Sequence, residues 1–312
     1  METITEKLRD FFTRISMPLT AFQFSSSYLS GLFLSSKDKK IKSYFVQPLG
    51  ENVVEPSFYK KNITNSAALE KSMRAGLARL KSSEHKVIFL LPELSQKIFI
   101  FPFESLPPSP EEKEEFIRFK IKKQMPMMPK DNRIAFDLIH SKNKGKVFVS
   151  IAREAVIREY EEFFHRQKVR IKMAGAPSLG LINLLASEKE NDFALVNIED
   201  HSFTMIVVVN SEIVFYRQKT LVIKTEAPEI LKQKIKNIQQ EIINTANFIE
   251  DKENRKISSL IIRLGVLGSD TEILQKLKER LDIPIHTIES AVKLKIPSFE
   301  KRILAPLIGQ VL

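Results

Sequence analysis

Side chains that could perform acid–base chemistry stand closest together at Glu199, Asp200 and His201. A carboxylate beside a histidine suits general acid–base catalysis, but the pair also needs a nucleophile or a positioned donor, and none accompanies it here. Three consecutive hydroxyl groups at residues 25–27 are typical of a polar turn between two strands. We therefore interpret both segments as turns, assign no catalytic residue and predict that the protein is not an enzyme.

Metal and phosphate chemistry find little support in the composition. The chain has no cysteine, which excludes disulfides and thiolate zinc sites. The histidines show no ligand spacing and are scattered as His85, His140, His165, His201 and His286. There is no Gly-x-x-x-x-Gly-Lys-Ser/Thr sequence, and the chain has nine glycines, where average usage would supply roughly 22. Loops that wrap phosphates depend on glycine, so the sequence predicts no metal and argues against a phosphate-binding loop.

The excess of basic residues is the second feature of the composition. The formal net charge is +11, and the densest clusters lie within residues 37–42, 142–146 and 166–172. None is interleaved with a row of aromatic side chains, as stacking on single-stranded nucleic acid would require. Solvated surface, attraction to an anionic membrane and binding of nucleic acid therefore remain as alternatives, in that order of preference.

Hydropathy predicts a cytoplasmic protein. No apolar run reaches the ~18–20 residues that cross a bilayer, and the acidic, polar residues 1–6 do not resemble a signal peptide. The apolar residues within 1–16 recur at the spacing of an amphipathic helix, which ends at Met17 and Pro18. We favour packing of this helix on the body of the protein over binding to a membrane or a partner, because its charges nearly cancel and it lacks a basic face.

The next part of the chain alternates between strand and helix patterns. Strands are predicted at residues 21–24, 29–34, 41–47 and 87–91, with a helix beginning at about Ser66. Residues 86–172 then form a predicted strand-strand-helix-strand-strand-helix unit. Its first helix, over about 110–124, has a capping box with proline at the first helical position and ends at Met125 and Pro126.

The second half repeats the opening pattern. Three strands at residues 193–198, 203–209 and 212–218 precede a long helix over about 228–250 and a buried strand at 260–264. A second capping box, beginning at Ser269, opens another helix. Two α/β halves facing a cleft describe the actin-like, ribonuclease-H-type duplicated fold. We predict an N-terminal helix over 1–17, a first domain over 18–190 with a subdomain inserted at about 86–172, a second domain over 191–294 and a C-terminal helix over 295–312.

Several short segments, taken in order, resemble the PilM proteins of type IV pilus machines. The chain has IRFK at residues 117–120, QMP at 124–126 and DLI at 137–139, where PilM proteins have IRFE, IPF and LDY. The similarity continues through residues 147–151, 153–167, 174–180, 194–198 and 304–309. This resemblance implies that the unit at 86–172 is the inserted subdomain of PilM and of the related cell-division protein FtsA.

The resemblance also implies a cleft that binds ATP, and the chain departs from the family at all three loops of that cleft. Gln23 and Ser25 replace an Asp-hydrophobic-Gly sequence, Asn197 and Glu199 replace the ends of Asp-Ile-Gly, and only Gly265 and Gly268 remain of a glycine run. An amide positions magnesium less well than a carboxylate does. Glu199 would repel a phosphate, and serine narrows the approach of the backbone. We therefore expect a degenerate cleft without ATP or magnesium.

PilM proteins hold the short cytoplasmic tail of the membrane protein PilN in a groove between the inserted subdomain and the first domain. Methionines between prolines offer an adaptable apolar surface for such a peptide. The candidate groove residues are Phe116, Phe119, Met125, Met127 and Met128, although these side chains would serve equally well as the subdomain core.

The resemblance leads us to expect a non-catalytic scaffold in the cytoplasm at the inner membrane. It would dock a PilN-like tail and couple the membrane complex to the pilus motor ATPase, with anionic lipid holding it by charge. An ATP-binding PilM in which nucleotide gates partner binding is the alternative. A basic protein that binds nucleic acid is the second alternative.

Overall fold

The computed structural model describes residues 17–35, 40–140, 145–186, 192–221, 228–268 and 270–311. The amphipathic helix predicted over residues 1–16 lies outside these ranges, as does Ser269 of the second capping box.

The first sheet has five strands in the order β3-β2-β1-β4-β8. β1, β2 and β3 form an antiparallel meander, whereas β4 and β8 run parallel to β1. The strands are β1 (Thr20–Phe24), β2 (Tyr28–Leu34), β3 (Ile41–Pro48), β4 (Lys86–Leu90) and β8 (Arg170–Gly175). β1 and most of β4 are buried because both strands lie inside the sheet and are covered on both faces.

The second sheet repeats this topology in the order β11-β10-β9-β12-β13. Its first three strands are again antiparallel neighbours, and β12 and β13 run parallel to β9. The strands are β9 (Phe193–Glu199), β10 (Ser202–Val209), β11 (Glu212–Thr220), β12 (Ser259–Gly265) and β13 (Ile285–Thr287). The predicted repeat of a three-stranded meander followed by a helix and a strand is therefore confirmed.

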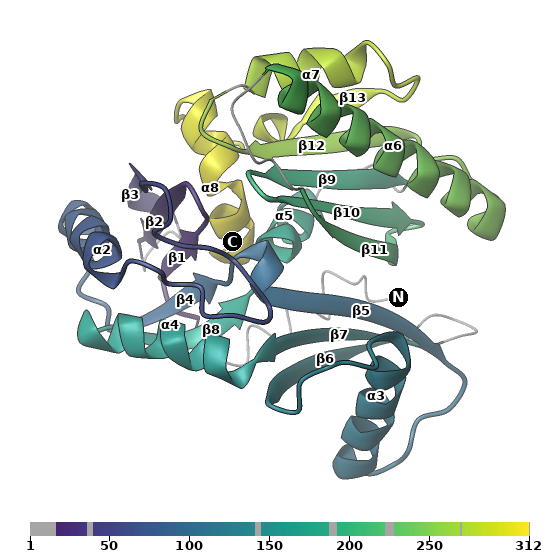
Figure 1. Ribbon diagram of the computed structural model, residues 1–312, viewed down its shortest axis with the longest axis horizontal. Helices are drawn as coiled ribbons and strands as arrows, with labels where there is room; N and C mark the ends of the chain where they lie inside the picture. The colour runs from purple at the N-terminus through teal and green to yellow at the C-terminus, as the bar shows by residue number, and fades with distance from the viewer. Residues whose placement is uncertain are drawn as a thin grey trace.

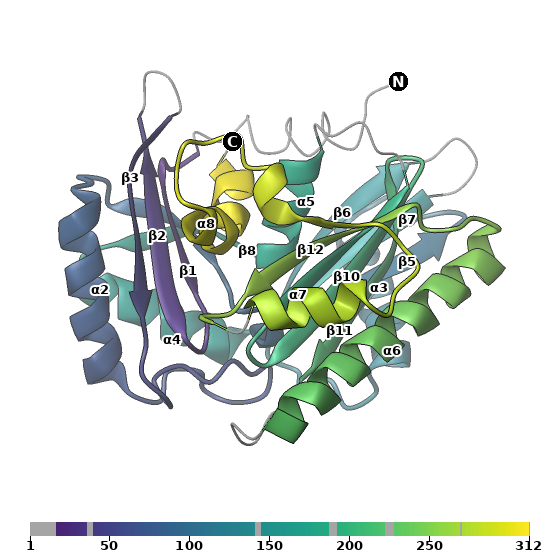
Figure 2. The same ribbon diagram turned by 90° about the horizontal axis from the view of Figure 1, so that it is seen from above.

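Helices cover both sheets and also separate them (Figures 1 and 2). α2 (Ser66–Leu80) and α4 (Glu154–Arg166) pack on the first sheet, and α6 (Pro228–Glu253) and α7 (Asp270–Lys278) pack on the second. α5 (Pro177–Leu185) and α8 (Ser298–Val311) lie between the sheets, in a core to which both sheets contribute. Gly180 in α5 and Gly309 in α8 allow the two helices to approach closely. A Cβ on Gly180 would stand 2.2 Å from the Pro306 carbonyl oxygen.

A third, smaller sheet with the order β5-β7-β6 forms the inserted subdomain. Its elements are β5 (Gln96–Phe103), α3 (Pro110–Gln124), β6 (Asn132–His140) and β7 (Gly145–Arg153). The Ser109 side chain caps α3 by accepting a hydrogen bond from the Glu112 amide at 3.2 Å, as the capping box predicts. α3 packs on the sheet through Ile117 and Ile121, which belong to the subdomain's own core.

The predicted extent of this subdomain, residues 86–172, is too wide. β4 and β8 are strands of the first sheet, and α4 packs in the core of that sheet. The separate sheet therefore spans Gln96 to Arg153. Local periodicity predicted β4 and α4 but not β8, and it carries no information about which sheet a strand joins.

Candidate functional site

A buried arginine lies where the β1–β2 hairpin of the first sheet meets β9 and β12 of the second. The guanidinium of Arg263, on β12, is fully buried, and its Nη1 donates hydrogen bonds to Asn197 Oδ1 and Glu199 Oε1, both at 2.9 Å. Its Nη2 donates to the Tyr28 hydroxyl at 2.7 Å, and its Nε donates to the carbonyl of Arg302 in α8 at 3.0 Å. One side chain thus joins both sheets and the helix between them.

Residues that the resemblance assigns to two of the nucleotide loops come together around this arginine. Gln23 Nε2 donates to Glu199 Oε1 and to the Tyr28 hydroxyl, both at 3.1 Å. Gln23 and Asn197 are fully buried, and Glu199 is 5% exposed. We refer to Gln23, Tyr28, Asn197, Glu199 and Arg263 as the Arg263 network. Its side chains bond to one another across the junction of the two domains, although the buried Gln23 Oε1 has no hydrogen-bond partner among the described residues.

The hairpin turns on either side of the junction are also bonded directly. Ser26 Oγ donates to Asp200 Oδ2 at 3.3 Å, and Ser27 Oγ donates to the same oxygen. Ser25 Oγ stays within its own turn, where it accepts from the Tyr28 amide at 3.0 Å. The segment at residues 25–27 is therefore a turn, as predicted, and it holds the acidic turn of the second domain.

The two predicted cleft glycines have different roles. A Cβ on Gly265 would stand 2.5 Å from Arg263 Nη1, so the absence of a side chain makes room for the guanidinium. Gly268 has a φ of +103°, which L side chains rarely adopt, and an added Cβ there would meet nothing within 4 Å. Gly265 therefore belongs with the Arg263 network, whereas Gly268 shapes a turn.

A buried carboxylate extends the network toward the inserted subdomain. Glu93, in the short 3₁₀ helix Glu93–Ser95 (η1), is 1% exposed. Its Oε1 accepts hydrogen bonds from the Ser178 amide at 2.7 Å and from Asn197 Nδ2 at 3.2 Å. The Ser178 amide lies in the first turn of α5, where the helix dipole favours a negative charge. Asn197 therefore links this carboxylate to Arg263.

Burial alters the titration of both acids in this region. It raises the pKa of Glu199 to about 7, with the neighbouring Arg263 charge opposing the effect. It also raises the pKa of Glu93, opposed by hydrogen bonds from Ser178 and Asn197. Both carboxyl groups therefore titrate above the usual range for glutamate.

Sequence analysis missed Arg263, Tyr28 and Glu93. A signal for the arginine was present, since Arg263 interrupts an otherwise apolar strand, and a charge buried within a strand must be paired. Glu93 gave a similar signal, because this carboxylate stands shortly after the buried strand β4. His201, in contrast, is exposed, and the described ranges contain no group of three side chains placed to hold a metal ion.

The predicted partner-groove residues divide into two groups. Phe116, Met125 and Met128 are partly buried and pack against the subdomain core. Phe119 is 54% exposed and Met127 is 88% exposed, and Lys123 Nζ lies 4.6 Å from the centre of the Phe119 ring. Three of the five side chains thus support the core, and the other two provide exposed apolar surface.

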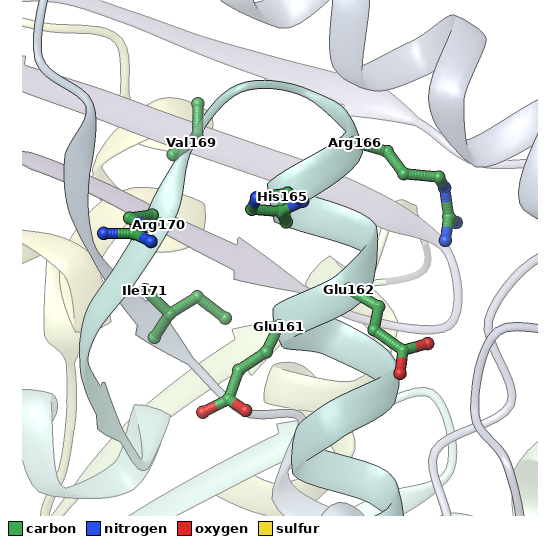
Figure 3. A pocket seen from close by; sticks show the side chains of 7 residues that line it. All are labelled: Glu161, Glu162, His165, Arg166, Val169, Arg170 and Ile171. Atoms are coloured by element: carbon green, nitrogen blue, oxygen red, sulfur yellow. The ribbon is translucent and has the colours of Figure 1, made fainter.

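A cavity of about 660 Å³ lies elsewhere, between the C-terminal part of α4 and the edge strand β8 (Figure 3). Its lining carries charges of both signs, and two of these are already paired. Glu161 bonds to Arg133 at 2.8 Å, and Arg166 bonds to Glu70 at 3.1 Å. None of the predicted site residues lines this cavity, and its mixed charges indicate no particular ligand.

Comparison with known proteins identifies the class of fold. No protein-family model and no curated protein matches the chain. Solved structures do match over nearly its whole length. A protein of unknown function with an actin-like ATPase fold from Bacteroides thetaiotaomicron aligns over 95% of this chain and 97% of its own, with 10% identity and a TM-score of 0.55. The ethanolamine utilization protein EutJ from Carboxydothermus hydrogenoformans aligns over 96% and 90%, with 8% identity and a TM-score of 0.52. The chain has the actin-like fold.

A stronger structural match is to a type IV pilus protein complex. A chain of the PilM–PilN type IV pilus biogenesis complex aligns over 96% of this chain and 98% of its own, with a TM-score of 0.76 and 13% identity. The predicted similarity of fold to PilM is thereby confirmed. Among the described residues, no helix is long and apolar enough to span a bilayer.

Proposed function

We propose that this protein is a non-catalytic, PilM-like scaffold of a type IV pilus or related secretion assembly, which docks the cytoplasmic tail of a PilN-like inner-membrane protein. The supporting observation is the structural match to the PilM–PilN complex, whose TM-score of 0.76 extends over 96% of this chain and 98% of the other. The alignment leaves out only a small share of this chain. Residues 96–153 are a much larger share, so most of the inserted subdomain lies within the alignment.

The Arg263 network supports docking without nucleotide. Gln23 and Asn197 stand where the resemblance places magnesium-positioning carboxylates, and amides are weaker partners for that ion. Glu199 and the guanidinium that neutralises it are buried at the junction of the two domains. Seating a triphosphate there would require the domains to part and would leave buried charges unpaired, at a cost of about 3–5 kcal/mol. These side chains do not fit Mg-ATP.

The exposed part of the subdomain is the proposed docking surface. Phe119 and Met127 present apolar surface beside Lys123. An aromatic ring and a flexible thioether are suitable anchors for an apolar peptide segment, and the lysine would attract acidic groups. A scaffold holding the tail here would transmit its position to the motor ATPase by contact rather than by hydrolysis.

Calorimetry of the full chain with a synthetic tail of the PilN-like protein from the same organism tests this proposal. We expect the same dissociation constant, within about twofold, with and without Mg-ATP. We also expect no heat from Mg-ATP alone at micromolar to submillimolar concentrations. Tail binding that appears only with Mg-ATP would overturn nucleotide independence and favour the ATP-gated alternative. Absence of tail binding under both conditions would overturn the docking function.

A further inference from the structure

A cavity of about 440 Å³ lies at the edge of the first sheet, and no residue of the Arg263 network lines it. One wall is the beginning of the edge strand β3, and the other is the segment that leads into α8. The wall residues that matter for binding are Lys40, Ile41 and Lys42 from the first segment and Leu294, Lys295 and Ile296 from the second. We call this cavity the lysine groove. It exists only in the folded chain, because about 250 residues separate its two walls in the sequence.

The charged side chains that line the lysine groove within the described part of the chain are all lysines. Lys40, Lys42 and Lys295 are exposed, and none of the described lining residues is a carboxylate. Glu300, in the first turn of α8, together with burial raises the pKa of Tyr44, which also lines the groove. All three cations are lysines. Lysine binds phosphate as a compact point charge.

The apolar residues of the two walls form the floor of the lysine groove. Ile41, Leu294 and Ile296 are partly buried and pack against the core between the two sheets. Phe299, in the first turn of α8 just beyond the groove, is 39% exposed. Lysine charges around apolar and aromatic side chains are typical of surfaces that rest at the boundary between lipid headgroups and acyl chains.

We propose that the lysine groove binds the phosphate headgroups of anionic phospholipids and so orients the protein on a membrane surface. The rim supplies charge complementarity, and the apolar floor favours a lipid over nucleic acid or an acidic peptide. β3 and α3 lie well apart in both Figure 1 and Figure 2, so lipid bound at β3 leaves α3 accessible. The proposal gives a location to the membrane attraction predicted from the charge of +11, and it does not depend on the pilus function.

Co-sedimentation of the full chain with phospholipid vesicles tests this proposal. The variant Lys40→Gln/Lys42→Gln/Lys295→Gln is compared with the control Lys232→Gln/Lys236→Gln/Lys278→Gln. The control lysines are exposed on α6 and α7 of the second domain, and both variants lose three positive charges. Vesicles contain phosphatidylcholine alone or phosphatidylcholine with phosphatidylglycerol, and thermal unfolding confirms that each variant is folded.

We expect wild-type protein to sediment with the anionic vesicles only. The groove variant should lose on the order of 100-fold in partitioning, since each surface-apposed lysine contributes roughly fivefold, whereas the control should lose less than about threefold. Equal losses in both variants would overturn the proposal in favour of diffuse attraction. Absence of wild-type binding would also overturn it. So would a groove variant that keeps its vesicle binding but loses retention on immobilised polyglutamate, because the groove would then be a site for acidic protein.

Discussion

The Arg263 network and the exposed side chains Phe119 and Met127 form two contrasting regions of this actin-like protein. In the network, every named side chain is buried and directed at a neighbour in the other domain or in α8. On the subdomain, Phe119 and Met127 expose more than half of their surface. The buried region joins the two domains through polar side chains, and the exposed region presents apolar side chains to solvent.

Under the proposed function, this contrast separates a junction that holds the two domains together from a surface that docks a partner. Polar side chains of the chain itself bond to one another across the domain junction, which links the two sheets. Partner binding is then expected at the surface, where substitution of an exposed apolar side chain changes the free energy of unfolding little. Substitutions in the two regions should therefore differ sharply in their effect on the free energy of unfolding.

Arg263→Met should have the largest effect. Methionine fills similar space but leaves Glu199 buried without its cation, so we expect a loss of about 3–5 kcal/mol in the free energy of unfolding, measured with urea. The control Arg74→Met removes an exposed charge from α2 and should stay within about 0.5 kcal/mol. A loss below about 1 kcal/mol at Arg263 would show that the network does not hold the domains together.

Gly265→Ala should come second, because the new methyl group would displace the guanidinium. We expect a loss of about 1–3 kcal/mol by urea unfolding. Gly50→Ala is the control, since its Cβ would meet nothing closer than Val53 Cγ2 at 4.0 Å. In the Arg263→Met background the alanine should cost much less, because the displaced group is gone. Full additivity of the two changes would contradict this account of Gly265.

The pH dependence of stability should reveal the raised pKa of Glu199. This pKa rises from 4.5 in an exposed group to about 7 in the folded protein. Between these values the folded state holds a proton that the unfolded state has released, so the free energy of unfolding falls as pH rises through this window. We expect wild type to lose about 1–3 kcal/mol relative to Glu199→Gln between about pH 5 and about pH 8. A difference that does not change with pH would contradict the assignment.

Substitutions on the subdomain should have the smallest effect on stability and the clearest effect on binding. Phe119→Glu and Met127→Glu should each change the free energy of unfolding by less than about 0.5 kcal/mol and weaken binding of the PilN-like tail by at least about tenfold. Phe116→Glu and Met128→Glu should instead destabilise by about 1–3 kcal/mol, because these side chains pack on the subdomain core. Calorimetric titration and urea unfolding separate the two groups, and unchanged tail binding in both exposed variants would exclude this surface.

Much of the secondary structure could be predicted because it follows local rules. Helix α3 has its capping box and its following proline, and β1, β2 and β3 have their turns and apolar runs, so each element is encoded within a few residues. The extent of the inserted subdomain could not be predicted in the same way. β4 has the pattern of any buried strand, and only pairing with β1 and β8 assigns it to the first sheet.

The candidate site shows the same limit. The sequence by itself determined that the loops at Gln23 and Asn197 carry amides where the resemblance expects acids, and that glycine is scarce. Only the tertiary structure decided what these amides contact. Arg263 lies 235 residues from Tyr28 along the chain, and Glu93 lies 104 residues from Asn197. Contacts over such separations depend on how whole sheets pack, which no local pattern encodes.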